Sequence, residues 1–371
     1  MATTFAVPDG RVAMAATTYT GNGSTQSISN AVNTVSFQPD LVWIKNRTSS
    51  YNHVLQDSIR GATAAAKLSS NLADAEGGAN LAPYGNVSAF NSNGFSLAAG
   101  SIDSRQTNTG SESFIGWQWK AGTSTVTNNS GTLSSQVNAN TTTGFSIVTW
   151  TGTGSGATSV GHGLPVLPQL VFVKKRNVAE NWYVGAYANQ GLNYAYHLFL
   201  NTNGANSGNN DPYVLGSQTS LTSNVLQLAD GISGNGGNQT GTNYVAYCWA
   251  PVAGYSAFGS YTGNGSADGP FIYTGFRPRF VLIKQFSGTP GAQVNCLWSL
   301  TDTSVNPYNF ATNTLMADSG TAPFTYATGI LDILSNGFKL RNAGFDFCNN
   351  SACSYIYAAF AENPLCYSNA R

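Results

Sequence analysis

The chain carries one pattern of apolar, glycine and lysine residues three times. An apolar segment ending on lysine reads FQPDLVWIKNR from Phe37, LPQLVFVKKRN from Leu167 and FRPRFVLIKQF from Phe276. Upstream of each segment lies an aromatic-Thr-Gly turn, which begins at Tyr19, Trp150 and Tyr261. Downstream, SNGFSL, SNVLQL and SNGFKL lead to FIGWQWKA, YVAYCWA and YIYAAFA. Three copies in one order predict three copies of one domain.

The repeats divide the 371 residues into units of about 110 residues, each long enough for its own core. We expect unit 1 in residues 1–122, unit 2 in residues 142–252 and unit 3 in residues 253–371. The Ser/Thr/Asn-rich segment 123–141 is interpreted as a linker or a long edge excursion of a sheet.

Short apolar runs separated by Gly, Asn and Ser clusters predict strands throughout the chain. The four residues before each aligned lysine, LVWI, LVFV and FVLI, are apolar on both faces of the strand. This is typical of strands buried inside a sandwich or beneath a neighbouring unit. Pro39, Pro168 and Pro278 are expected at equivalent strand beginnings. Only Ser58–Asn71, with its alanine run, predicts a short surface helix. The predicted fold class is all-β, with three tandem antiparallel, jelly-roll-like β-sandwich repeats.

Charge is scarce and balanced, since charged residues make up 9% of the chain and 16 basic residues oppose 16 acidic ones. No basic field exists to bind nucleic acid. No apolar run has the length of a signal peptide or a membrane span, so we expect neither secretion by the usual route nor membrane insertion. Five cysteines argue against a disulfide framework, although Cys348 and Cys353 could pair. No residue spacing indicates a zinc site or another cofactor.

Comparison of the units argues against an enzyme. No acidic residue occupies one position in all three units, because Asp40 is replaced by Gln169 and then by Arg279. A glycosidase needs two neighbouring carboxylates, and a site confined to one unit would have to draw on Asp103, Glu112, Asp230 or Asp346. The three histidines fit no nucleophilic triad.

Two groups of residues are candidates for binding. The aligned lysines Lys45, Lys174 and Lys284 are expected to lay their stems along the strand and to place the ammonium at the sandwich rim, near carbonyls or a carboxylate. Anion or partner binding is the alternative. The aromatic residues Trp182, Tyr183 and Tyr213 lie outside the repeated positions and could stack on sugar rings, or they could belong to the core.

The third unit, YTGNGSADGPFIYTGFRPRFVLIK with SNGFKL and YIYAAFAENP, resembles a repeat in virion proteins of tailed bacteriophages of marine and cyanobacterial hosts. GHGLPVLPQLVFVKKRN and YHLFLNTN in unit 2 are similar to the same group. The resemblance implies a virion location and a role in host attachment or assembly. It favours a tail fibre or tail appendage that forms a homo-oligomer, most simply a trimer. The expected partners are other virion proteins and a host-surface glycan. Capsid decoration, a spacer without ligand and a glycan-degrading tailspike are the alternatives.

Overall fold

The computed structural model describes residues 5–154, 156, 158–186, 198–204, 215, 223–229, 236–287, 296–343, 347–351 and 353–364. The regular structure in these ranges consists of strands and two short 3₁₀ turns, η1 (Gly10–Val12) and η2 (Ala64–Ala66). The predicted all-β class is confirmed. Within the described ranges, no helix is long and apolar enough to cross a membrane.

A four-stranded antiparallel sheet with the same strand order occurs in every unit. Unit 1 forms it from β1 (Met14–Thr20), β7 (Ser113–Trp119), β3 (Leu41–Asn46) and β4 (Val54–Asp57), in that order. The corresponding strands of unit 2 are β10 (Phe145–Thr151), β16 (Asn243–Trp249), β12 (Leu170–Lys175) and β13 (Tyr183–Ala186). Those of unit 3 are β17 (Ser256–Thr262), β25 (Ser354–Pro364), β19 (Phe276–Ser287) and β20 (Trp298–Asp302). The threefold repeat of the sequence is therefore a repeat of topology.

A second, smaller sheet belongs to each unit. These sheets are β2 (Gln26–Ser29), β6 (Gly94–Ala98) and β5 (Asn86–Asn91) in unit 1, β11 (Thr158–Gly161) and β15 (Val225–Leu228) in unit 2, and β18 (Phe271–Tyr273), β24 (Gly337–Leu340) and β23 (Leu331–Leu334) in unit 3. In unit 1, Ile28 and Phe95 of the small sheet share one buried cluster with Val42 and Ile44 of the large sheet. Each unit is thus a sandwich of two unequal sheets, less regular than a jelly roll.

Further strands lengthen the large sheets of units 2 and 3. They are β14 (Leu198–Phe199), β9 (Ser135–Asn140) and β8 (Val126–Asn128) in unit 2, and β21 (Asn313–Met316) and β22 (Phe324–Thr325) in unit 3. Because β9 pairs with β10 from Phe145 to Thr149, segment 123–141 is an edge excursion of the sheet and not a linker.

Two local predictions need correction. Residues 58–71 form no α-helix: only η2 is helical, and Leu68 pairs instead with Leu55 of β4. The tertiary bridge outweighs the helix propensity of the alanines. Pro39 and Pro168 each precede a strand by two residues, but Pro278 is the third residue of β19 and lies at a β-bulge, where a missing N–H is tolerated.

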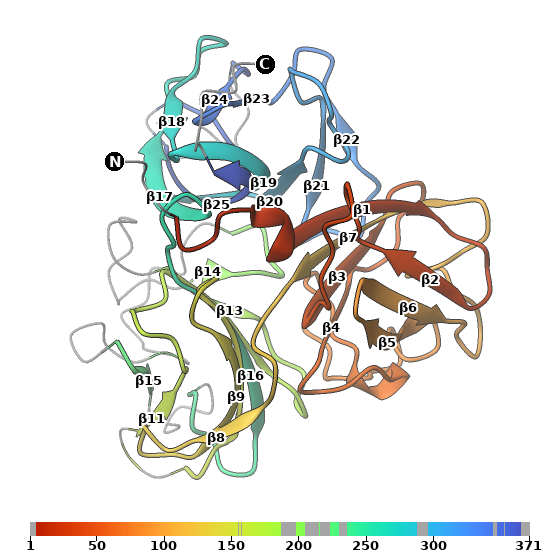
Figure 1. Ribbon diagram of the computed structural model, residues 1–371, viewed down its shortest axis with the longest axis vertical. Helices are drawn as coiled ribbons and strands as arrows, with labels where there is room; N and C mark the ends of the chain where they lie inside the picture. The colour runs from red at the N-terminus through yellow and green to blue at the C-terminus, as the bar shows by residue number, and fades with distance from the viewer. Residues whose placement is uncertain are drawn as a thin grey trace.

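The three large sheets face a common centre, so the units close into a ring with approximate threefold symmetry (Figure 1). Alternate residues of β3 show the consequence: Leu41 and Trp43 belong to the shared central core, whereas Val42 and Ile44 fill the sandwich of unit 1. At the centre, the ring of Trp119 lies 5.9 Å from that of Trp249 and 5.8 Å from that of Phe360. These three residues occupy the same position in YVAYCWA and its two counterparts.

Candidate functional site

The aligned lysines connect each unit to a neighbouring unit. Each is fully buried and donates from Nζ to a backbone carbonyl of another unit: Lys45 to Gly320 at 3.0 Å, Lys174 to Ala73 at 3.2 Å and Lys284 to Thr202 at 3.3 Å. The contacts run cyclically, from unit 1 to 3, from 2 to 1 and from 3 to 2. The ammonium groups do lie near carbonyls, but inside the ring and not at an exposed rim. Their role in the structure is to join the units.

A second set of contacts between the units follows the same cyclic order. In each unit a ring nitrogen, at or just before the start of the strand that follows the lysine strand, contacts a backbone carbonyl of the neighbouring unit. Trp182 Nε1 donates to the carbonyl of Ser69 at 2.7 Å, and Trp298 Nε1 to that of Phe199 at 2.8 Å. In unit 1 the equivalent residue is His53, whose Nε2 lies 3.0 Å from the carbonyl of Met316. Burial, followed by the charge of nearby Lys45, lowers the pKa of His53, so the ring is held neutral.

The prediction that Trp182 and Tyr183 contact a ligand needs correction. Trp182 is 0% exposed and Tyr183 is 3% exposed, so both are core residues. Tyr213 lies outside the described residues. The alternation of strand β13 places Trp182 against the ring centre and Tyr183 in the sandwich of unit 2, which leaves neither ring accessible to a sugar.

The candidate carboxylates are occupied by neighbouring side chains where they are described. Asp103 binds Arg105 through both oxygens, and Glu112 accepts from Asn46 and, at 2.6 Å, from Ser49. Asp230 and Asp346 lie outside the described residues. Cys348 and Cys353 form no disulfide with each other and are both buried.

Exposed aromatic residues gather instead on the small sheet of unit 3. On β18, Phe271 is 44% exposed and Tyr273 is 66% exposed, while Ile272 between them points into the core. Gly337 lies opposite Tyr273, and a Cβ on this glycine would come within 3.1 Å of the Phe271 ring. The lack of a side chain there lets the Phe271 ring lie across the sheet.

Two further aromatic residues flank the opposite edge of this sheet. Asn309 accepts from the backbone N–H of Ile333 and donates to its carbonyl, both at 2.9 Å, and so fixes its loop along β23. The adjacent Tyr308 is 83% exposed and Phe310 is 46% exposed. We call Phe271, Tyr273, Tyr308 and Phe310, with the sheet between them, the aromatic face.

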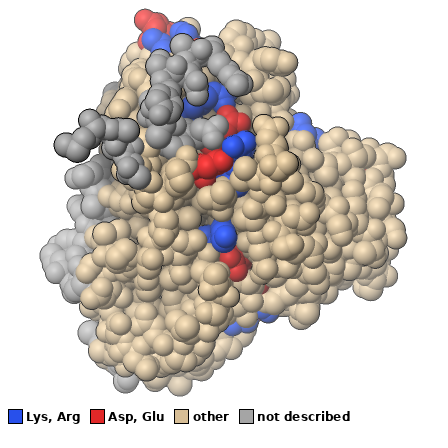
Figure 2. Space-filling model, viewed as in Figure 1, with Lys and Arg blue, Asp and Glu red and all other residues tan. Residues whose placement is uncertain are grey.

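Ion pairs lie between the aromatic residues. Asp332 of β23 accepts from Arg341 at 2.5 Å, and Lys339 of β24 pairs with Asp268 at 2.6 Å. Arg341 beside Asp332, and Lys339 beside Phe271, bring hydrogen-bonding groups to an otherwise apolar surface. Elsewhere charge is sparse: Figure 2 shows a mostly uncharged face, with many of its charged side chains in a band near the middle and others at its edges.

Among the described residues, the pair Phe271 and Tyr273 has no aromatic counterpart in the other units. The positions of Phe271 and Tyr273 correspond to Ser27 and Ser29 in unit 1, because Ile28 pairs with Phe95 as Ile272 pairs with Phe338. In unit 2 the equivalent residues are Ser159 and Gly161. Sequence analysis missed these residues, although aligning Ile28, Val160 and Ile272 as inward positions would have placed their neighbours outside.

A family model described as a domain of unknown function (DUF7483) matches residues 12–364 and so spans all three units. Neither the curated proteins nor the solved structures contain a match to the chain.

Proposed function

The chain belongs to the DUF7483 family, a domain of unknown function. We propose that it is a virion protein of a tailed bacteriophage and that it contacts the host envelope through the aromatic face. The observation that carries the proposal is the pair Phe271 and Tyr273, exposed in unit 3 where the other units have serine or glycine. The resemblance of the third unit to phage virion repeats supports the location.

The chemistry of the face suits a saccharide. Flat aromatic rings stack on the apolar C–H faces of sugars and lose little conformational entropy on binding. Charged and polar side chains between the rings, such as Arg341 and Lys339, can bond to sugar hydroxyls. Exposed aromatic rings also favour self-association in a protein with only 9% charged residues, so the retention of Phe271 and Tyr273 at positions that hold serine or glycine in the other units calls for a functional reason.

The closed ring supports a structural role in the virion. The three units share one central core, so the aromatic face is part of a single rigid body. The inner sheet surfaces, which separate sandwiches would use to form a trimer, are already buried within one chain. A homo-oligomer of this chain, or its attachment to other virion proteins, must therefore use outer surfaces.

The proposal predicts that the double variant Phe271→Ser/Tyr273→Ser, which copies the unit 1 sequence, binds host cells about ten-fold or more weakly, because two stacking contacts are lost. Adsorption of labelled purified protein to host cells measures this. Ile102→Ser is the matched control, since Ile102 is 65% exposed in unit 1 and lies outside the aromatic face.

Equal adsorption of the wild type and the double variant would refute the aromatic face as the contact. The alternative is then a spacer or capsid decoration protein without a host ligand, and a protein of that kind would show no saturable adsorption in either form.

A further inference from the structure

A groove with a volume of about 400 Å³ lies in unit 2, next to its border with unit 1. It forms where β9 leaves β10: the two strands are paired only as far as Gln136 and Thr149, whereas β10 continues along β16 to Thr151 and Asn243. The residues lining it are mainly hydroxyl and amide side chains, and none of them is acidic: Leu133, Ser134, Ser135, Gln136, Thr149, Trp150, Thr151, Thr153, Arg176 and Asn243.

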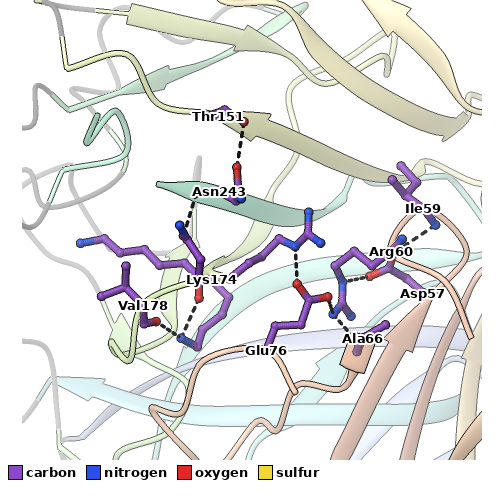
Figure 3. A network of polar contacts seen from close by, with 12 residues as sticks. Asp57, Ile59, Arg60, Ala66, Glu76, Thr151, Lys174, Val178 and Asn243 are labelled. Carbon is purple, nitrogen blue, oxygen red and sulfur yellow. Dashed lines mark hydrogen bonds and ion pairs between the residues drawn. The ribbon is translucent and has the colours of Figure 1, made fainter. Parts of the chain in front are cut away.

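Among the described residues that line this groove, Arg176 is the only charged one, and it is held in place from unit 1. Its Nε donates to Glu76 Oε2 at 2.7 Å, and its backbone carbonyl accepts from the N–H of Glu76, also at 2.7 Å. The other carboxylate oxygen of Glu76 accepts from Arg60 at 2.9 Å, and Arg60 is itself buried against Asp57 (Figure 3). Glu76 is thereby fixed between two guanidinium groups.

This anchoring leaves one edge of the Arg176 guanidinium available. No hydrogen bond from its Nη1 or Nη2 occurs among the described residues, and 27% of the side chain is exposed. Glu76 approaches from the Nε side, so the two Nη groups can still form the parallel pair of bonds that arginine makes with a carboxylate. A fixed orientation lowers the entropy cost of that bidentate contact.

Neighbouring side chains supply groups for hydroxyls. Thr151 donates to Asn243 Oδ1 at 2.8 Å, which orients the amide and leaves its Nδ2 as a donor (Figure 3). Gln136 Nε2 donates to Thr127 at 3.0 Å, which leaves Gln136 Oε1 as an acceptor. A ligand with one carboxylate beside several hydroxyls matches these groups.

We propose that this groove binds the carboxylate of an acidic saccharide, of the uronic acid type, with Arg176 as the carboxylate receptor and Asn243 and Gln136 as hydroxyl partners. The choice of a saccharide rests on the proposed host-surface role, but the site is independent of the aromatic face. A peptide with a C-terminal carboxylate fits less well, because seven of the ten described lining residues carry a hydroxyl or amide side chain, and these suit the hydroxyls of a saccharide.

The test is calorimetric titration of the purified full chain with a galacturonic acid trisaccharide and with its methyl ester, at 0.15 M salt. We expect the acid to bind at least about ten-fold more tightly than the ester, since the ester cannot accept the charge-assisted pair of bonds. Arg176→Gln should remove this preference, and Arg176→Lys should restore it only in part because lysine cannot bind bidentately.

Controls separate the site from general effects of charge and folding. Arg277→Gln should leave binding unchanged, because Arg277 is similarly exposed at 33% and ion-paired to Glu362 but does not line the groove. Asn243→Asp leaves the Glu76 network intact and should weaken binding of the acid more than that of the ester, because the new carboxylate beside Arg176 repels the carboxylate of the ligand.

Equal affinity for acid and ester, unchanged binding in Arg176→Gln, or no binding at millimolar saccharide would overturn the proposal. Tighter binding of a peptide C-terminus than of the saccharide would likewise overturn the saccharide assignment. Phe271→Ser/Tyr273→Ser should leave this titration unaffected, so failure of the aromatic face and failure of the groove give different results.

Discussion

At the scale of single residues, the threefold repeat places one fully buried lysine in each unit, Lys45, Lys174 and Lys284. Each Nζ is removed from water and bonded to backbone carbonyls. Lys45 and Lys174 each donate to the carbonyl of the following residue, Asn46 at 2.9 Å and Lys175 at 2.8 Å, whereas Lys284 donates to that of Cys296. Burial lowers the pKa of Lys45 to about 7 and those of Lys174 and Lys284 to about 8. Burial also lowers the pKa of Lys67, in unit 1, to about 7.

These pKa values predict that the protein becomes more stable as the pH rises above 7. The unfolded chain has lysine pKa values near 10.5 and binds more protons than the native state between about pH 7 and 10.5, so the free energy of unfolding increases with pH there. Each lysine contributes a slope of up to about 1.4 kcal/mol per pH unit. Urea unfolding at pH 7, 8, 9 and 9.5 measures the slope.

The variant Lys45→Met assigns part of this slope to one residue. Methionine keeps the buried stem and removes the titration, so the slope should fall by up to about 1.4 kcal/mol per pH unit. The range from pH 7 to 9.5 excludes the titration of Asp318. Burial raises the pKa of Asp318 to about 6, so its contribution to the free energy of unfolding is lost as the pH rises from about 4 to 6. A slope that is unchanged in the variant would show that Lys45 is not the titrating group.

At the scale of elements, the aromatic-Thr-Gly turn after the first strand of each unit is explained by one repeated contact. Asn108, Asn238 and Asn349 are fully buried, and each accepts from the N–H that follows the turn glycine, at 3.0, 2.7 and 3.0 Å. The aromatic residue bonds to the carbonyl just before this asparagine: Tyr19 to Thr107, Trp150 to Gly237 and Tyr261 to Cys348. The turn thus ties the first strand to the loop before the last strand.

The glycine in this turn is required by close approach of the two segments. A Cβ on Gly21 would lie 2.1 Å from the carbonyl oxygen of Thr109, so Gly21→Ala should cost about 2 to 3 kcal/mol of unfolding free energy. Gly110→Ala is the matched control in the same loop pair, since its nearest contact would be 3.8 Å away, and it should change stability by less than about 0.5 kcal/mol. Denaturant unfolding compares the two. Similar effects of both changes would contradict this account of the turn.

At the scale of the whole molecule, the three interfaces are related but unequal. Tyr247 of unit 2 donates to Asp57 of unit 1 at 2.8 Å, and Trp117 of unit 1 donates to Asp302 of unit 3 at 3.1 Å. The equivalent positions between units 2 and 3 hold two alanines, Ala186 and Ala358. Donor and acceptor are absent together at these two positions, so neither alanine leaves a partner side chain without its hydrogen bond.

The shared core predicts that a unit cannot fold alone as a soluble monomer. Residues 142–252 by themselves would expose Phe145, Phe172, Tyr247 and Trp249, which the full chain buries against the other units. We expect this fragment to aggregate, or to bind a hydrophobic dye more strongly than the full chain does. Sedimentation and dye fluorescence test this. A soluble monomeric fragment that unfolds cooperatively would show that the units are independent domains.

The sequence by itself determined the threefold repeat, the all-β class, the positions of the main strands and the burial of the lysine segments on both faces. These properties follow from residue order and side-chain alternation, which are local. Which unit each buried face contacts is not local. Only the tertiary structure therefore decided that Lys45 joins unit 1 to unit 3, that Trp182 is core, and that segment 123–141 extends a sheet.

The same distinction between local and non-local properties decides which candidate site could be predicted from the sequence. The aromatic face follows from alternation once the units are aligned, and Phe271 and Tyr273 could have been recognised in this way. The groove at Arg176 could not, because it depends on Glu76, a residue 100 positions away that reaches Arg176 only when the ring closes. Closure is set by the sum of many apolar contacts between distant segments, and no single stretch of the sequence specifies it.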